Sequence, residues 1–179
     1  KRIAILGGTS TGEIKEQLEI FLLNSNIRPD FYECEYGQYY EAVMFEDESL
    51  KKFNPEIIYI HISNENLKSL NDVDQISEDR AKDEFIKLEF IWQKLSQSFE
   101  CKIIQDNFEL PSFKSLGNFD VSSKSSITRT LNILNEMLYK QAIEKNYLHI
   151  CDRNYLSSKL GLTNWKDYSL WLSARYSLS

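Results

Sequence analysis

The chain has 179 residues, of which 42% are hydrophobic and 27% are charged, and its formal net charge is −6. This length and composition are typical of one soluble globular domain, and no apolar stretch approaches the roughly 18 residues that a membrane span requires. The acidic balance argues against nucleic-acid binding, which usually needs a basic surface. We therefore expect a single domain over residues 1–179, with neither a nucleic acid nor a membrane as its partner.

The chain start and the cysteines indicate the context of the domain. Lys1 and Arg2 lead straight into an apolar run without an initiator Met, which is typical of a piece of a longer chain. Cys34, Cys101 and Cys151 lie far apart and have neither CxxC nor metal-ligand spacing. We expect them to be reduced, buried thiols of a cytoplasmic protein.

Five short apolar runs predict the strands, and longer amphipathic segments between them predict helices. The predicted strands are residues 2–6, 30–34, 56–62, 101–105 and 147–151. The first, third and fifth runs are continuously apolar, as in parallel strands that are buried on both faces. The predicted helices are residues 12–24, 79–98 and 124–145, the last with Ser123 or Ser125 as its N-cap.

This alternation of strand and helix predicts an α/β fold, a three-layer, doubly wound parallel sheet of about five strands in the flavodoxin-like order 2-1-3-4-5. One irregular stretch, residues 106–123, is too long for a simple turn. Long irregular connections of this kind are often functional.

Polar residues follow each predicted strand, and the carboxyl ends of parallel strands form the edge at which ligands bind. Candidate substrate-binding residues at this edge are Gly8, Gly37, Asn64, Asn107 and Asp152. The residues at this edge are mostly small and polar, and few of them are basic.

The first turn, Gly7-Gly8-Thr9-Ser10, precedes a predicted helix and has three interpretations. Its hydroxyl groups could cap the helix, or the turn could bind an anion at the helix N-terminus. Alternatively, Ser10 or Thr9 could be a nucleophile, and a one-residue shift of the turn would exchange the two. The sequence is neither GxGxxG nor a Walker A motif, so dinucleotide binding is not expected.

A nucleophile needs a base, and the sequence contains two histidines, His61 and His149. Both fall inside predicted strands among apolar neighbours, so we expect both to be buried core residues. A conventional Ser-His-Asp relay then has no histidine at the edge of the sheet. The histidines and cysteines also form no cluster with metal-ligand spacing, so no metal site is expected.

Five segments together resemble one known family over almost the whole chain. They are IAILGGTST, FYECEYGQYYEAVM, LKKFNPEIIYIHI, IIQDNFELP and HICDRNYLSSKLGLTNWKDYSLWLS, of which the last is the most specific. They resemble the N-terminal domain of FkbH-like proteins. Members of this family join an SGNH-hydrolase-like domain to a HAD-type, phosphatase-like domain. The best known transfer a phosphoglyceryl unit to an acyl carrier protein for polyketide extension, and others occur with cell-envelope glycan pathways.

The resemblance also implies roles for single residues. Thr9 or Ser10 would occupy the nucleophile position, and Gly8 would replace the acid of the first conserved block. Gly37 and Asn64 would correspond to the glycine and asparagine of the oxyanion hole. The final Asp-x-x-His block falls on Asp167-Tyr168-Ser169-Leu170, so Asp167 is kept and the histidine base is replaced by leucine.

We weigh three hypotheses for this chain. In the first, a degenerate SGNH-like domain positions a small phosphorylated substrate or an acyl carrier protein for an adjoining HAD-type domain of the same chain. In the second, Ser10 is an active nucleophile for acyl transfer or ester hydrolysis, with a base from the neighbouring domain, or with His61 if the strand ends earlier than predicted. In the third, the domain is a structural module that packs on the HAD-type domain. No cofactor is expected in this domain, and Mg²⁺ is expected only in the HAD-type domain.

Overall fold

The structure is a computed structural model that describes residues 1–165. Its centre is a five-stranded sheet with the order β2-β1-β3-β4-β5, in which all neighbouring strands are parallel. The strands are β1 (Arg2–Gly7), β2 (Asp30–Glu33), β3 (Ile57–His61), β4 (Lys102–Asp106) and β5 (Leu148–Cys151). The predicted flavodoxin-like order and doubly wound fold are therefore confirmed.

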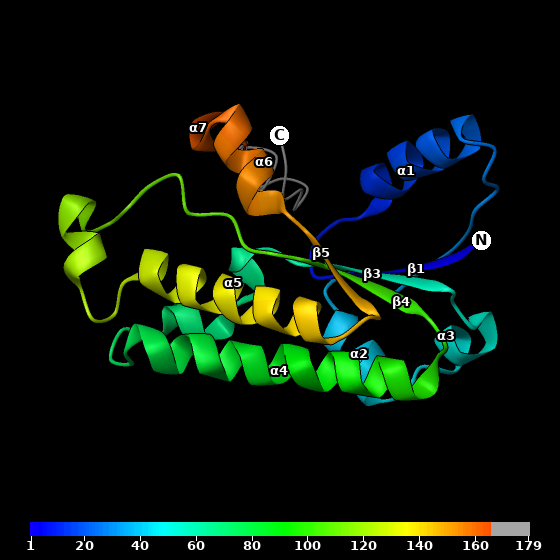
Figure 1. Cartoon of the computed structure of the whole chain (residues 1–179), viewed down its shortest axis with the longest axis horizontal. Helices are drawn as coiled ribbons and strands as arrows, with labels where there is room; N and C mark the ends of the chain where they lie inside the picture. The colour runs from blue at the N-terminus through cyan, green and yellow to red at the C-terminus, as the bar shows by residue number, and fades with distance from the viewer. Residues whose placement is uncertain (166–179) are drawn as a thin grey trace.

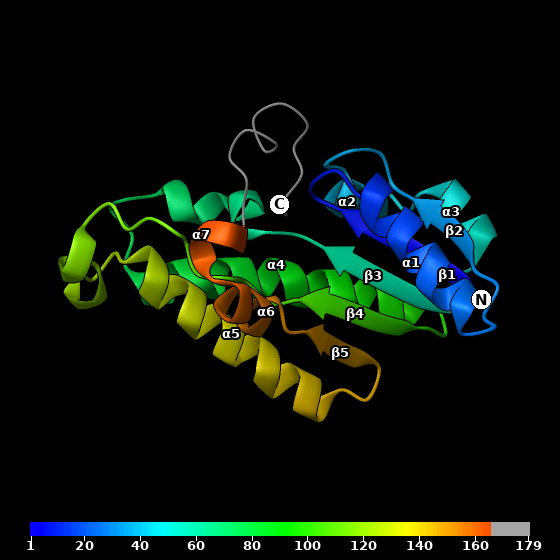
Figure 2. The ribbon, with the colours of Figure 1, turned by 90° about the horizontal axis from the view of Figure 1, so that it is seen from above.

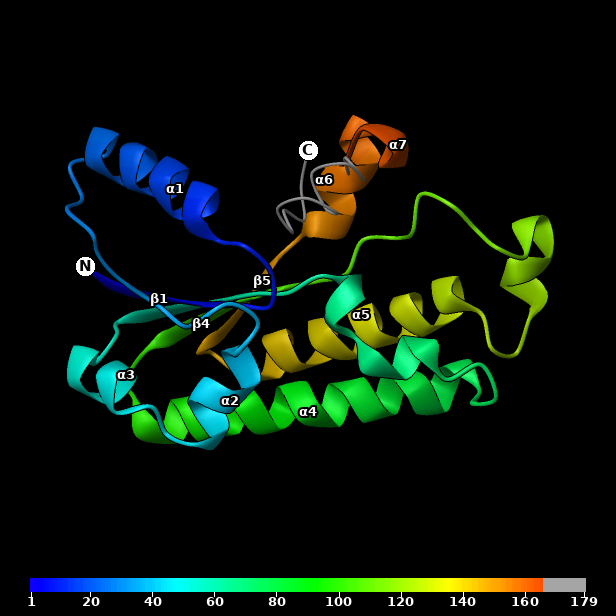
Figure 3. The same ribbon diagram turned by 180° about the vertical axis from the view of Figure 1, so that it is seen from behind.

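Helices cover the sheet on both faces and make the third layer that the sequence predicts. Helices α2 (Tyr39–Met44), α4 (Ser77–Ser98) and α5 (Ile127–Glu144) lie on one face, and α1 (Gly12–Asn24), α6 (Arg153–Leu160) and α7 (Leu162–Trp165) lie on the other (Figure 1, Figure 3). Helix α3 (Glu48–Phe53) and the 3-10 turns η1 (Asn64–Asn66), η2 (Lys68–Asn71) and η3 (Gly117–Ser122) complete the described chain. The short helices α2 and α3 were not predicted, because segments of six residues show too little periodicity.

The main core lies between the sheet and the pair α4 and α5. The predicted inner face of α4 is confirmed, since Leu88, Ile91, Trp92 and Leu95 are all buried. The indole N–H of Trp92 donates to Gln105 Oε1 of β4 at 3.1 Å, so its polar atom is satisfied inside the core. Each large side chain buried here contributes roughly 1.5–3 kcal/mol, which fixes these helices on the sheet.

The opposite face of the sheet is less completely covered than the sequence predicts. Helix α1 contains no buried residue, and Phe21, expected on its inner face, is 67% exposed. His149, expected in the core, is exposed on the edge strand β5. Ile143, expected on the inner face of α5, is 85% exposed, although Lys145 at the end of this helix reaches α4 and pairs with Glu89 at 3.3 Å.

Three further local predictions can be compared with the structure. The N-cap of α5 is Ser126, whose side chain accepts the N–H of Arg129, so neither Ser123 nor Ser125 is the cap. The cysteines are free thiols as predicted, although each is half-buried rather than buried. Within residues 1–165, no helix combines the length and apolar character needed to cross a bilayer.

Candidate functional site

The turn after β1 makes close contact with the segment that follows β3. The N–H of Gly8 donates to the carbonyl oxygen of His61 at 2.9 Å, and the Asn66 amide donates to the carbonyl oxygen of Gly8 at 2.8 Å. A Cβ atom on Gly8 would lie only 2.6 Å from Cγ of Asn66. Glycine is therefore required here by close packing against Asn66, and both backbone polar groups of Gly8 are already bonded within the protein.

The hydroxyl groups of this turn do not cap the following helix. Thr11 is the N-cap residue of α1, but its hydroxyl donates to Glu33 Oε2 at 2.9 Å instead of accepting a helix N–H. Thr9 is 2% exposed, and its hydroxyl has no hydrogen-bond partner in the described part of the chain. Ser10 is half-buried. Of the two alternative nucleophiles, Thr9 is therefore the buried one and Ser10 the more accessible one.

A cleft of about 380 Å³ lies beside this turn, at the carboxyl edge of the sheet between α2, η1 and α4. It brings together two of the predicted substrate-binding residues, Gly8 and Gly37, with Asn66. Gly37 has a φ of +72°, a conformation that favours glycine, and a side chain there would meet no atom within 4 Å. The remaining wall includes Tyr39, Tyr40, Glu41, Glu65, Lys68, Glu84 and Lys87.

Some charged side chains of the cleft are paired with an opposite charge, and others are not. Glu84, 4% exposed, accepts the backbone N–H of Ser69 at 2.7 Å and pairs with Lys87 at 3.0 Å. Lys68 forms no ion pair with any residue of the range 1–165. Burial, followed by the charge of Glu84, raises the pKa of Tyr39 to about 12, so its hydroxyl stays a hydrogen-bond donor at neutral pH. As far as residues 1–165 show, the ammonium group of Lys68 and the protonated phenol of Tyr39 are therefore available to a ligand in the cleft.

Asn64, the residue predicted for the oxyanion hole, does not line this cleft. Its amide donates to the backbone oxygen of Glu109 at 3.4 Å. Asn66, two residues further on, takes the place beside the glycines and was missed by the sequence analysis. Its Oδ1 accepts the N–H of Ser63 at 2.9 Å and its Nδ2 binds Gly8, so its amide is engaged at both ends.

Asn107 and Asp152, two other predicted substrate-binding residues, are brought together but bind each other. The Asn107 amide donates to Asp152 Oδ1 and to the hydroxyl of Tyr139, both at 2.7 Å, and its Oδ1 accepts the N–H of Asn154 at 2.9 Å. Asp152 is the N-cap of α6 and accepts the N–H of Tyr155 at 3.1 Å. Their contacts orient the start of α6.

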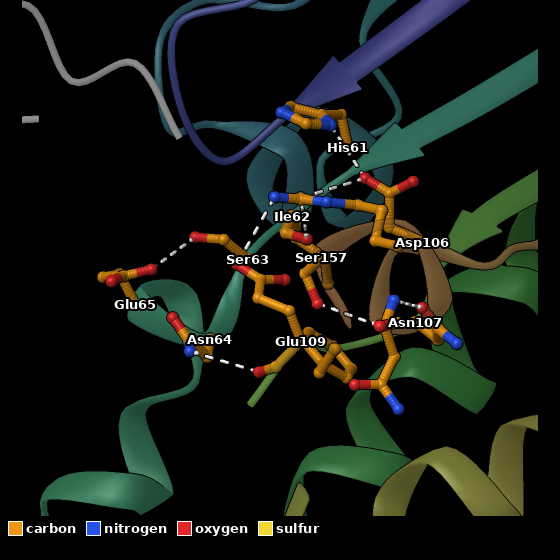
Figure 4. A network of polar contacts seen from close by, with 12 residues as sticks. His61, Ile62, Ser63, Asn64, Glu65, Asp106, Asn107, Glu109 and Ser157 are labelled. Atoms are coloured by element: carbon orange, nitrogen blue, oxygen red, sulfur yellow. Dashed lines mark hydrogen bonds and ion pairs between the residues drawn. The ribbon is translucent and has the colours of Figure 1, made fainter. Parts of the chain in front are cut away.

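A buried charged network lies at the ends of β3 and β4, and it was not predicted. His61 Nδ1 lies 2.7 Å from Asp106 Oδ2 (Figure 4). The hydroxyl of Tyr59 donates to the same carboxylate at 3.0 Å. Arg153 reaches Asp106 at 3.3 Å and Glu109 at 3.4 Å from the start of α6. His61 is 1% exposed and Asp106 0%, so the network is shielded from water.

One finding in this network corrects the sequence analysis, which placed no histidine at the carboxyl edge of the sheet. Strand β3 ends at His61 rather than at residue 62, so a histidine does lie at the carboxyl edge, buried against an aspartate. The Asp106–His61 contact resembles the way in which a carboxylate orients a catalytic imidazole. Burial disfavours the charge of Arg153, but Glu109 and Asp106 outweigh this effect and raise the guanidinium pKa. The network therefore holds Arg153 as a permanent cation.

The remaining site predictions concern acids and metals. Asp167 and Leu170, the remains of the last conserved block, lie outside the described residues. Among residues 1–165, no group of three or more His, Cys, Asp or Glu side chains is placed to hold a metal ion. The absence of a cofactor from this domain remains a prediction.

Three solved structures are similar to this chain. The N-terminal part of the protein BF1531 from Bacteroides fragilis, described as containing a phosphatase domain complexed with Mg, aligns with a TM-score of 0.83 and 23% identity over 99% of this chain. TesA aligns with a TM-score of 0.59 and 11% identity, over 94% of this chain and 87% of its own. BF3764 of Bacteroides fragilis, described as an acylhydrolase, aligns with a TM-score of 0.52 and 13% identity, over 94% of this chain and 71% of its own. These likenesses show that the chain shares its α/β fold with TesA and with BF3764.

The family of the FkbH N-terminal domain matches residues 2–179. The chain belongs to this family, as its sequence motifs predicted. It spans 47% of the BF1531 chain to which it is similar. None of the curated proteins matches the sequence.

Proposed function

We propose that this chain is a non-hydrolysing SGNH-like domain that positions a substrate for an adjoining HAD-type phosphatase or transferase domain. The observation that carries this proposal is how the nucleophile hydroxyl and the oxyanion-hole amides, which hydrolysis would need, are bonded. The buried hydroxyl of Thr9 has no hydrogen-bond partner among residues 1–165, and the amides of Asn64 and Asn66 donate to the backbone oxygens of Glu109 and Gly8. An amide already bonded to a carbonyl oxygen is not available to an oxyanion.

The ligand class that suits the cleft is a small phosphorylated molecule with hydroxyl groups. Lys68 offers a free positive charge for a phosphate, and the Tyr39 phenol and the exposed Glu41 carboxylate suit hydroxyl groups. An acyl carrier protein is a less suitable ligand for this domain, because carrier proteins are acidic and this chain has a net charge of −6. On this proposal the adjoining domain supplies Mg²⁺ and the phosphoryl chemistry.

A second candidate function is ester hydrolysis, and the buried His61–Asp106 pair favours it, because such a pair can orient a general base. Short p-nitrophenyl esters distinguish the two functions. We expect the wild-type chain to release p-nitrophenol no faster than its Ser10→Ala and Thr9→Val variants. Turnover that either substitution abolishes would establish hydrolysis and contradict the positioning role.

The positioning role predicts a specific effect of Lys68 on the protein that carries the HAD-type domain. With phosphorylated hydroxy acids as substrates, Lys68→Met is expected to raise KM about tenfold with little change in kcat, because it removes an interaction made equally in ground and transition states. Lys52→Met is the control, since Lys52 is also an exposed lysine but lies on α3, away from the cleft. Equal KM values for the two variants would contradict phosphate binding in the cleft.

A further inference from the structure

The long connection between β4 and α5 forms an arm, residues 109–126, that extends from the carboxyl edge of the sheet. Figure 1 and Figure 2 show it projecting beyond the ends of α4 and α5, with η3 at its tip. Most of the arm belongs to the irregular stretch, residues 106–123, that the sequence analysis singled out. Apart from Glu109 at its base, which pairs with Arg153, the arm takes no part in the cleft or the buried network.

The tip of the arm presents large apolar side chains to solvent. Phe113 is 75% exposed, Phe119 66%, Val121 59% and Leu116 47%. Four such residues lie within nine positions of the sequence, whereas single exposed apolar residues are normal on protein surfaces. Clusters of this kind mark surfaces that bind another protein segment.

A small cleft of about 230 Å³ continues this apolar surface toward α5. Its wall is made by Val121, Thr128, Arg129, Asn132 and Ile133. Thr128 is 6% exposed, and its hydroxyl has no hydrogen-bond partner in the described part of the chain. A buried, unsatisfied hydroxyl is costly, so an incoming main-chain or side-chain polar group would gain a hydrogen bond here. The surface thus combines apolar contacts with one specific polar anchor.

Both ends of the arm are held rigidly. At its base, the buried Asn135 side chain accepts the N–H of Phe108 at 2.9 Å and donates to the Phe108 oxygen at 2.7 Å. At its other end, where the arm joins α5, Ser126 donates to the buried Asp120 carboxylate at 2.9 Å.

Helix α4 also holds the end of the arm that joins α5. The Ser77 N–H donates to the Lys124 oxygen at 2.8 Å, and the buried Arg80 guanidinium donates to the Ser125 oxygen at 2.9 Å. A preformed surface loses little conformational entropy when it binds a partner.

We propose that the arm is the docking surface for the domain that follows this one in the same polypeptide. This inference rests on the proposed function, which requires such a domain. In the similar BF1531 structure, more than half of the chain lies outside the part that aligns here. The arm leaves the carboxyl edge that also holds the cleft, so docking on it would place the second domain at the substrate-binding edge. Its tip is mainly apolar, with Lys114 half-buried and Lys124 exposed where the arm joins α5, and a mainly apolar surface suits a permanent interdomain contact better than an acidic carrier protein.

The test uses the full-length protein with p-benzoylphenylalanine placed at position 119 and irradiated. We expect an intramolecular crosslink from position 119 to peptides beyond residue 179, mapped by mass spectrometry. Ile143 provides the control position, because it is 85% exposed on α5 away from the arm. We expect no crosslink from position 143. We also expect the crosslink from position 119 to disappear when Val121→Asp is added.

Isotope-mixed protein separates the possible partners in this test. A crosslink that joins labelled to unlabelled chains would assign the arm to a second copy and overturn the proposal. A yield at position 119 no higher than at position 143 would overturn it as well. The readout does not depend on enzymatic activity, so failure of docking and failure of the positioning role give different results.

Discussion

Arg153→Met is expected to lower the free energy of unfolding by about 3–5 kcal/mol, measured by urea unfolding. Arg153 is 3% exposed and pairs with the buried carboxylates of Asp106 and Glu109. Methionine keeps much of the apolar side-chain volume but leaves both carboxylates without their cation. The guanidinium also donates to the Ile62 oxygen at 3.2 Å, so this carbonyl group loses a partner too.

The matched control for this prediction is Arg129→Met. Arg129 also pairs with a carboxylate, that of Glu78, but both side chains are about half exposed. Exposed ion pairs are screened by water, so the expected loss is within about 1 kcal/mol. Equal losses for the two variants would show that the carboxylates near Arg153 have become neutral or hydrated, and that the network does not hold α6 on the sheet.

Asn135→Leu is expected to lower the free energy of unfolding by about 2–6 kcal/mol, because it leaves two buried backbone groups without partners at roughly 1–3 kcal/mol each. The Asn135 amide bonds both the N–H and the oxygen of Phe108, where the arm begins. Leucine fits the volume of the site but can bond neither group. Hydrogen exchange at Phe108 is expected to rise in parallel, which ties the loss to the base of the arm.

Asn132→Leu is the control on the same helix. Asn132 lies one turn away on α5 and is exposed, so this substitution is expected to change stability by no more than about 0.5 kcal/mol. If both variants unfolded at the same urea concentration, the two hydrogen bonds from Asn135 to the Phe108 backbone would contribute nothing to stability.

The sheet was the most predictable part of this protein. Continuous apolar runs such as that of β3 occur in strands buried on both faces, and the alternation of such runs with helices is typical of the doubly wound order that the structure shows. The inner face of α4 was predictable for a similar reason, because its apolar residues recur with the period of a helix.

The coverage of the second face was not predictable. Phe21 has the right spacing to be buried on α1, and His149 has apolar neighbours on β5, yet both are exposed. Periodicity reports which face of an element is apolar, but burial also requires a neighbouring element that lies against that face.

Within the site, the sequence determined that small and polar residues gather at the carboxyl edge, because parallel strands all end there. It also determined the family, through motifs such as IAILGGTST at the first turn.

Only the tertiary structure decided what these residues do. Asn66 rather than Asn64 packs on Gly8, and Asn107 is engaged by Asp152. Asp106 joins His61 and Arg153 in a buried network, through contacts between residues 45 and 47 positions apart that no local pattern encodes. Hydrogen-bond partners are set by distances of about 3 Å, and such distances exist only once the chain has folded.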